Sequence, residues 1–319
     1  MTKVLVTGGA GYIGAHVAAE LLNEGYSVRI YDDFSNGLHK RVDGKFRDIV
    51  EGDILDREKL LQAMQGVDAV IHLAAKKAVE ESVKNPLKYY ENNVGGTLNL
   101  LAAMSAKGVK TIVFSSSAAV YSPNDKDAVE ETDPTVPLSP YGATKLLSEE
   151  LISSVGNAEK ISHVSLRYFN VVGSAIPEFG DNSKDNLVPK VFLALKNGKR
   201  PEIYGSDYPT PDGTCIRDYI HVQDLAKAHV AALKKAESGF TSAVYNVGSG
   251  KGYSVREMMN QISQTLGKDI NPQESPARAG DSPKLIASIK KIEQELGWKP
   301  TATLKEMIDS SWAAESSNS

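Results

Sequence analysis

A tyrosine and a lysine four positions apart are the residues in this chain best suited to chemistry. Tyr141 and Lys145 follow Ser139-Pro140, and a serine run, Ser115-Ser116-Ser117, precedes them. Residues four apart project from one face of a helix, so the phenol and the ammonium can meet beneath a single substrate. The combination indicates redox chemistry on an alcohol.

The tyrosine needs help to act as a base. Its pKa must fall about three units from about 10, which corresponds to roughly 4 kcal/mol of preference for the phenolate. One positive charge about 4 Å away supplies on the order of 4 kcal/mol at an effective dielectric near 20, and an oxidised nicotinamide adds a second cation. We therefore predict that Tyr141 and Lys145 are catalytic, and that Ser117 hydrogen-bonds the reacting hydroxyl.

A glycine cluster between the first expected strand and helix predicts a dinucleotide site. Gly8, Gly11 and Gly14 permit a tight turn and let backbone amides approach a pyrophosphate at a helix N-terminus. Asp32 closes the next expected strand, where a carboxylate binds an adenosine ribose and repels a 2′-phosphate, so NAD is favoured over NADP. Asp53 is a second candidate, for the adenine edge. Simple turn roles for the glycines and for Asp32 are the structural alternatives.

The elements that position these residues alternate along the first half of the chain. Strands are expected at 4–7, 28–31, 49–51, 69–72, 111–115 and 164–169, and helices at 12–23, 57–64, 86–107 and 140–154. Such alternation is typical of a parallel sheet with helices on both faces. The predicted fold class is therefore α/β, a Rossmann-type doubly wound parallel sheet.

The residue composition changes after residue 170. Pro, Gly, Asp and Asn concentrate in 175–186 and 198–213, which indicates a smaller, loop-rich C-terminal substrate lobe. Residues 217–248 revert to the earlier style, with a helix expected at 222–235 and a strand at 243–247. We expect residues 1–170 to bind NAD together with the return segment 217–248, and 171–319 to form mainly the substrate lobe.

Composition excludes several classes of protein. The 319 residues carry a net charge of -4 without a Lys/Arg block, so neither nucleic acid nor a membrane surface is an expected partner. Cys215 is the single cysteine, which rules out an internal disulfide and favours the cytoplasm. We see no signal peptide or membrane-spanning run, and the histidines show no ligand-like spacing, so no metal is expected.

Motifs along nearly the whole chain resemble those of the extended short-chain dehydrogenase/reductase family and, within it, the UDP-glucose 4-epimerases. They are the glycine cluster, His72-Leu73-Ala74-Ala75, Lys77-Ala78-Val79, the segment 89–93, the serine run with 118–121, Pro140 to Lys145, Leu166 to Asn170, and Gly213 to His221. One departure is Ala15, where the family commonly has a serine; it touches only a helix-start hydrogen bond.

The resemblance implies two sets of ligand contacts. For NAD it adds Tyr12, Ile13, Asp32, Asn36, Asp53, Ile54, Leu73, Ala74, Ala75, Lys77, Asn93 and Phe169 to the glycines, Ser117, Tyr141 and Lys145. For a UDP-hexose it implies Asn170, Asn186, Leu187, Ile203, Tyr204, Arg217, Arg278 and Asp281, with Leu285 at a position that tunes acceptance of N-acetylated sugars. Two arginines suit a diphosphate, and a carboxylate suits a ribose diol.

The implied reaction is reversible oxidation at sugar carbon 4. Tyr141 would take the proton of the 4-hydroxyl while NAD takes the hydride, and both would return to the opposite face of a 4-keto sugar, so that UDP-glucose and UDP-galactose interconvert in galactose metabolism.

Several alternatives stay open at this point. A nucleotide-sugar dehydratase or decarboxylase would need extra acid/base groups where Ala118 and Ala119 stand. An NAD-sensing regulator could share the fold, although the intact Tyr141, Lys145 and Ser117 argue against it. Activity on UDP-N-acetylhexosamines depends on Leu285. We also expect a homodimer, paired through the helices 86–107 and 140–154.

Overall fold

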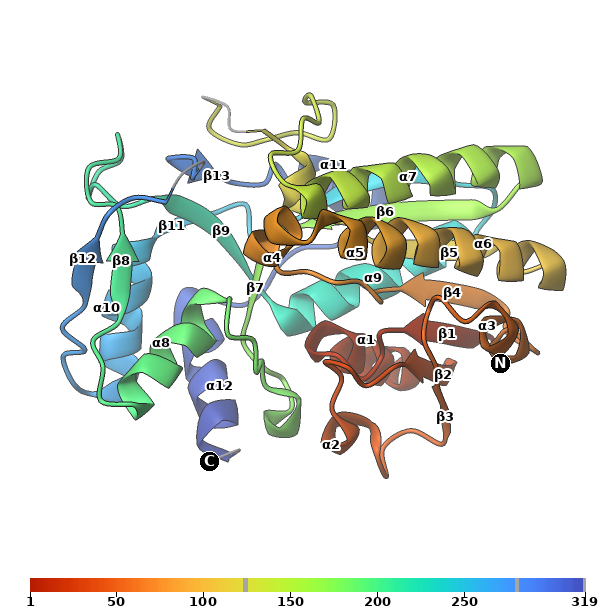
Figure 1. Ribbon diagram of the computed structural model, residues 1–319, viewed down its shortest axis with the longest axis horizontal. Coiled ribbons are helices and arrows are strands. Elements are labelled where there is room, and N and C mark those ends of the chain that lie inside the picture. The colour runs from red at the N-terminus through yellow and green to blue at the C-terminus, as the bar shows by residue number, and fades with distance from the viewer. Residues whose placement is uncertain (123–125, 279–280, 318–319) are drawn as a thin grey trace.

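Seven parallel strands form the central sheet of the computed structural model, which describes residues 1–122, 126–278 and 281–317 (Figure 1). In spatial order the strands are β10 (Ser242–Val247), β6 (Ser162–Tyr168), β5 (Thr111–Ser115), β4 (Ala69–His72), β1 (Lys3–Thr7), β2 (Ser27–Asp32) and β3 (Asp48–Glu51). The direction in which successive strands are added reverses beside β1, so the carboxyl ends of β1 and β4 border a crevice that suits a ligand. The predicted doubly wound sheet is confirmed.

Helices cover both faces of this sheet because successive strand side chains point to opposite sides. Val4 and Val6 of β1 pack in one buried cluster with α1 (Tyr12–Asn23) and α9 (Val222–Glu237). Leu5 packs in another cluster, with α3 (Arg57–Ala63), α6 (Gly96–Lys107) and α7 (Pro140–Glu159). Nearly continuous apolar runs in the central strands follow from this two-sided burial.

The expected helix 86–107 is not one α-helix. It consists of α5 (Pro86–Tyr89), a π-helical segment η1 (Tyr90–Gly95) and α6, and a further helix, α4 (Val79–Lys84), precedes it. The π segment turns Asn93 into the interior, where it is 3% exposed. Periodicity alone carries no signal for such a local widening. Helix α7 also extends beyond the expected end at 154, to a left-handed cap at Lys160.

The C-terminal region contains more helix than its composition indicated. Strands β7 (Asn170–Val172), β9 (Ile216–His221), β11 (Gly252–Ser254) and β13 (Lys284–Leu285) form a second sheet, and β8 (Glu202–Tyr204) pairs with β12 (Gln273–Ser275). The apolar faces of α8 (Leu187–Lys196), α10 (Val255–Leu266) and α12 (Leu304–Ser317) share one core. Figure 1 shows these elements grouped at the end of the molecule away from β1 to β3.

The remaining elements are short. They are α2 (His39–Val42), α11 (Lys290–Leu296) and the 3-10 turns η2 (Ala118–Val120) and η3 (Pro177–Phe179). The chain leaves the large sheet after β6, crosses into the second sheet at β7 and β9, and returns through α9 and β10, which pairs with β6. Of the helices in the described ranges, none has the length and apolar character to cross a membrane.

Candidate active site

The glycine turn and the start of α1 lie in direct contact. Gly8 has a left-handed backbone, with φ of +71°, and a Cβ on Gly14 would lie 2.1 Å from the Gly8 carbonyl oxygen. Gly11 is the N-cap of α1, and its amide donates to the same carbonyl oxygen at 3.1 Å. Only glycines fit this approach, which is the arrangement that lets a helix N-terminus receive a pyrophosphate.

Asp32 stands beside this turn, at the end of β2. Its two carboxylate oxygens accept the amides of Ala10 and Phe34, each at 2.9 Å. Burial raises its pKa, and the two amides oppose that shift. Each oxygen keeps a lone pair that could accept a ribose hydroxyl.

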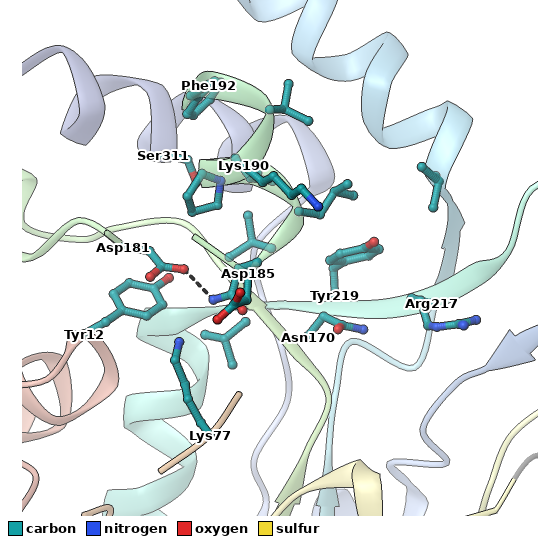
Figure 2. A pocket seen from close by; sticks show the side chains of 18 of the residues that line it. Tyr12, Lys77, Asn170, Asp181, Asp185, Lys190, Phe192, Arg217, Tyr219 and Ser311 are labelled. Carbon is teal, nitrogen blue, oxygen red and sulfur yellow. Dashed lines mark hydrogen bonds between the residues drawn. The ribbon is translucent and has the colours of Figure 1, made fainter. Parts of the chain in front are cut away.

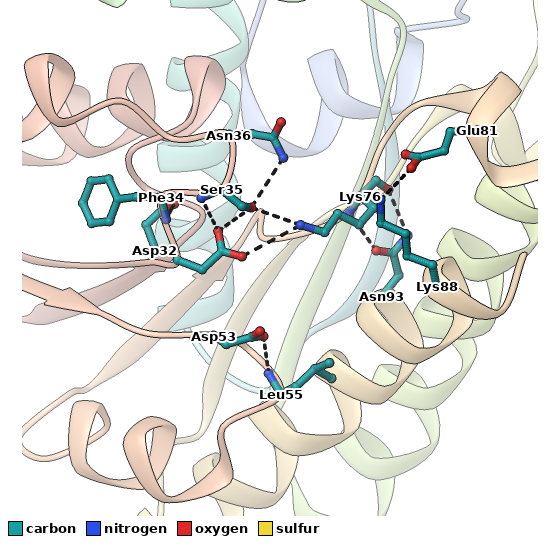
Figure 3. Close-up of polar contacts among 11 residues, drawn as sticks. Asp32, Phe34, Ser35, Asn36, Asp53, Leu55, Lys76, Glu81, Lys88 and Asn93 are labelled. Carbon is teal, nitrogen blue, oxygen red and sulfur yellow. Dashed lines mark hydrogen bonds and ion pairs between the residues drawn. The ribbon is translucent and has the colours of Figure 1, made fainter. Parts of the chain in front are cut away.

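Several polar side chains lie close together at the same end of the sheet (Figure 3). Lys76 Nζ donates to Ser35 Oγ at 3.0 Å, next to Asn36, and Asp53 accepts the amide of Leu55 at 2.9 Å. These groups flank the space beyond Asp32 where an adenosine could lie. Lys76 is an addition to the set expected from the sequence, which named its neighbour Lys77.

The segment after β4 is held against the glycine turn. A Cβ on Gly8 would lie 2.7 Å from the amide nitrogen of Ala74. Asn93 accepts the Lys76 amide at 2.8 Å and donates to the Lys76 carbonyl and to Thr144 Oγ1, both at 3.0 Å. The side-chain amide of Asn93 is therefore engaged in fixing the segment of Leu73 to Lys77 to α7.

Tyr141 and Lys145 share one face of α7 as expected, but they have different partners. Tyr141 hydrogen-bonds Ser117, whereas Lys145 Nζ donates to the Ser115 carbonyl at 2.7 Å and lies 4.9 Å from the centre of the Phe114 ring. Burial raises the pKa of Tyr141, and the Ser117 bond opposes that shift. Burial therefore dominates the Tyr141 pKa in the protein alone, and the lowering expected from Lys145 together with an oxidised nicotinamide stays a prediction.

Burial also disfavours the charged form of Lys145 itself. It lowers the pKa of this ammonium to about 7, and the carboxylate of Glu149 opposes the shift. An ammonium has three donors, of which one is used at Ser115, so two remain for a ligand. Ser117 lies two residues beyond the end of β5 and caps η2, where its Oγ accepts the Ala119 amide at 3.1 Å.

A cavity of about 1390 Å³ opens beside Tyr141 and extends into the C-terminal region (Figure 2). The sequence-predicted residues that line it are Tyr12, Ile13, Lys77, Ser117, Tyr141, Phe169, Asn170, Asn186, Leu187, Tyr204, Arg217, Arg278, Asp281 and Leu285. Tyr12 and Lys77 lie toward the glycine turn, and Arg217 lies at the opposite end (Figure 2). A ligand could thus reach from the dinucleotide turn to the second sheet.

The other predicted residues lie outside this cavity. They are Gly8, Gly11, Gly14, Asp32, Asn36, Asp53, Ile54, Leu73, Ala74, Ala75, Asn93, Lys145 and Ile203. All but Ile203 are on the strand ends and helices of the large sheet. Ile203 has no exposed surface and belongs to the core of the C-terminal region, so it supports the cavity wall from behind.

Three positively charged side chains, from Lys190, Arg217 and Arg278, belong to the cavity wall. The Arg278 guanidinium lies 4.0 Å from the centre of the Tyr204 ring, and Lys190 Nζ lies 5.0 Å from the same centre. Arg217 donates to the carbonyls of Ile216 and Ser282 at 2.9 and 2.8 Å, and its Nη2 lies 3.4 Å from Asp281 Oδ1. Two cations beside one ring, with a third on the same cavity wall, suit a diphosphate. Sequence reasoning missed Lys190, because a lone lysine on a helix is ordinary.

Arg41 is a second residue that the sequence did not single out. It belongs to α2, is fully buried, and donates through Nη2 to the Gly180 carbonyl at 2.6 Å and to Asn182 Oδ1 at 2.9 Å. Its Nη1 lies 3.4 Å from the Ala10 carbonyl in the glycine turn. Arg41 therefore joins the dinucleotide turn to a loop that borders the cavity. The sequence did not reveal this role, because a basic run such as His39-Lys40-Arg41 is typical of a charged protein surface.

Leu285 forms part of the cavity wall on β13, paired with Arg217 of β9. It packs partly buried against the cluster that contains Ala118 and Phe169.

Among the residues of the three described ranges, no cluster of three or more His, Cys, Asp or Glu side chains could hold a metal ion.

Comparisons with known proteins agree with this geometry. Residues 4–248 match the model of the NAD dependent epimerase/dehydratase family. The chain is 44% identical to a UDP-glucose 4-epimerase of Corynebacterium glutamicum, over 98% of this chain and 95% of the relative, and 43% identical to that of Bacillus subtilis, over 99% and 97%. The crystal structure of UDP-glucose 4-epimerase from Bifidobacterium longum in complex with NAD+ and UDP superimposes with a TM-score of 0.92 at 40% identity, over 99% of each chain.

Proposed function

Because the chain belongs to the NAD-dependent epimerase/dehydratase family, we propose that it interconverts UDP-glucose and UDP-galactose with NAD as its cofactor. It is an isomerase of the UDP-glucose 4-epimerase type. The observation that carries the proposal is the position of Tyr141 and Ser117, which line a cavity running from the dinucleotide turn to a group of cations. Ala118 and Ala119 stand beside them in place of the acids that a dehydratase would need.

In the proposed mechanism Tyr141, as phenolate, removes the proton of the sugar 4-hydroxyl and later returns it to the oxygen of the 4-keto sugar, after the sugar has turned over. The chemistry that NAD would supply when bound is reversible hydride transfer, away from one face of carbon 4 and back to the opposite face. Ser117 donates to or accepts from the reacting oxygen and keeps the phenol in place. Because burial raises the pKa of Tyr141, the phenolate needs the charge of an oxidised nicotinamide in addition to that of Lys145.

Substrate affinity is expected to come mainly from the nucleotide diphosphate. Lys190, Arg217 and Arg278 supply positive charge in the cavity wall, and Asp281 supplies a carboxylate. The hexose must be able to turn either face of its carbon 4 toward the cofactor, so we expect the protein to hold the sugar loosely. We propose that residues 1–170 with the return segment 217–248 bind NAD and that the rest of 171–319 mainly holds the UDP-sugar.

The decisive assay is conversion of UDP-galactose by the purified protein without added reductant, with the products resolved by chromatography. UDP-glucose should form, and loss of water or carbon dioxide, or no turnover with NAD present, would sink the proposal. Tyr141→Phe should abolish turnover while NAD stays bound. Tyr219→Phe, which removes a hydroxyl elsewhere in the same cavity, is the matched control and should remain active.

We further propose a cytoplasmic homodimer. Large apolar side chains are exposed along the helices that the sequence suggested for pairing, with exposed fractions of 82% for Leu87, 38% for Tyr90, 47% for Leu98 and 40% for Leu147. A two-fold pairing of these helices would cover them. Light scattering should give twice the chain mass, and Leu87→Glu should yield a monomer; a monomeric wild type would refute the pairing.

A further inference from the structure

Helix α7 carries a third functional group on the face of Tyr141 and Lys145. Glu149 follows Lys145 by four residues, as Lys145 follows Tyr141, so the three side chains form one row along the helix. Only 7% of Glu149 is exposed. A carboxylate in the interior is costly unless it is paired and hydrogen-bonded, so its partners are informative.

The partners of Glu149 come from β6 and from the residue that follows β5. Arg167 of β6 donates through Nε to Oε1 at 3.0 Å and through Nη2 to Oε2 at 2.7 Å, and this guanidinium is 7% exposed. Ser116 donates its hydroxyl to Glu149 Oε1. Arg167 is fixed in turn by Tyr121, whose hydroxyl accepts Nη1 at 2.9 Å. The pair is thus bidentate, buried and held from several sides.

Ser116 lies between the two residues that contact the catalytic pair. The carbonyl of Ser115 accepts Lys145 Nζ, and the hydroxyl of Ser117 bonds Tyr141. The side chain of Ser116 is the one anchored to Glu149. Rotation of the Ser116 backbone would therefore displace a partner of Lys145 and a partner of Tyr141 together.

We propose that the Glu149–Arg167 pair is a positioning unit for the reaction, which holds the serine run through Ser116 and keeps Lys145 and Tyr141 aligned. The inference rests on the proposed function. Neither Glu149 nor Arg167 lines the cavity, so the pair acts through the serines without touching substrate.

Charge gives the pair a second effect on Lys145. Glu149 favours the ammonium form against burial, and Arg167 compensates part of that negative charge. The other titratable groups around this site come from separate elements: Tyr141 on α7, His72 on β4 and His229 on α9 are buried, and Tyr168 on β6 is partly buried. Burial keeps both histidines neutral by lowering their pKa values. Glu149 is then the negative group that supports the Lys145 charge.

The test uses the full-length enzyme with its bound NAD. Turnover of UDP-galactose is measured against pH for wild type, Glu149→Gln and Ser116→Ala, with Glu150→Gln, an exposed neighbour, as the matched control. Glu149→Gln should lower kcat about tenfold with KM for UDP-galactose within twofold, and should move the alkaline limb of the profile about one pH unit lower, because an amide does not support the ammonium. Glu150→Gln should match wild type.

Ser116→Ala keeps the ion pair intact and decides the matter if Glu149→Gln, which leaves Arg167 unpaired, does not fold. It should lower kcat several-fold without moving the alkaline limb. Wild-type kcat in Ser116→Ala, or a wild-type pH profile in folded Glu149→Gln, would overturn the positioning role while leaving the epimerase assignment intact. An inactive wild type would overturn both.

Discussion

Gly14→Ala is the substitution that most directly tests the dinucleotide turn. The added Cβ would lie 2.1 Å from the Gly8 carbonyl oxygen and 2.8 Å from Gly9 Cα, and both atoms belong to the backbone, which cannot rotate away. Overpacking of this kind costs about 3 kcal/mol. With an unfolding entropy of about 2.1 cal/mol/K per residue, that cost lowers Tm by about 5 °C for a chain of this length.

Gly95→Ala is the matched control for this prediction. Gly95 has φ of -61°, and the nearest atom to its added Cβ is Leu55 Cδ2 at 3.7 Å. Replacement there should leave Tm unchanged or raise it by about 1 °C, because alanine stabilises a helix by roughly 0.5–1 kcal/mol over glycine.

The assay pairs thermal unfolding with the amount of NAD released on denaturation. Displacing the start of α1 from the turn should weaken NAD binding at least tenfold, which is about 1.4 kcal/mol. The reasoning is refuted if Gly14→Ala keeps wild-type NAD content and a Tm within 1 °C of wild type. It is also refuted if Gly95→Ala is as damaging as Gly14→Ala.

Three further predictions concern the cavity and the response to pH. Arg41→Met, which removes the link to Gly180 and Asn182, should raise KM for UDP-galactose several-fold with kcat within twofold, whereas the exposed Arg47→Met should not; equal kinetics would contradict the link. Burial lowers the pKa of His16 to about 4, so the unfolded chain takes up an extra proton between pH 6.5 and 4, and stability falls by about 1.4 kcal/mol per pH unit on acidification. Tm of His16→Gln should decline less steeply in that window, and an unchanged slope would exclude His16 as a contributor. Leu285→Tyr should reduce turnover of UDP-N-acetylgalactosamine relative to UDP-galactose and Leu285→Ala should raise it; identical ratios would discard Leu285 as a size filter.

Local signals made the strand and helix positions in the large sheet predictable. Helix α1 begins and ends at the expected residues, because a glycine turn and a polar stop bound one apolar stripe. The prediction of one α-helix over 86–107 was wrong because the π-helical turn depends on hydrogen bonds of Asn93 with Lys76 and Thr144, which are distant in sequence. Helix α8 lies between the loop-forming stretches 175–186 and 198–213, which obscured it, whereas α10 begins at a capping box of Ser254 and Glu257 that is a helix signal in the sequence.

The candidate site was predictable where a side chain carries a motif and not where it acts through the backbone. Helical spacing placed Tyr141 and Lys145 on one face, but the partner of Lys145 is a carbonyl, which any residue at position 115 would supply. Likewise, the role of Arg41 depends on a carbonyl at Gly180 that lies far along the chain. Tertiary contacts of this kind leave no pattern in a single sequence.

The return of the chain to the large sheet has a consequence for synthesis on the ribosome. Strand β10 pairs with the outer edge of β6, and α9 covers part of one face of the sheet. A nascent chain of 170 residues therefore exposes an unpaired strand edge and apolar surface, which favour aggregation. The large sheet can be completed only after residue 247 has left the exit tunnel, so NAD capture should be a late event in the biogenesis of the enzyme.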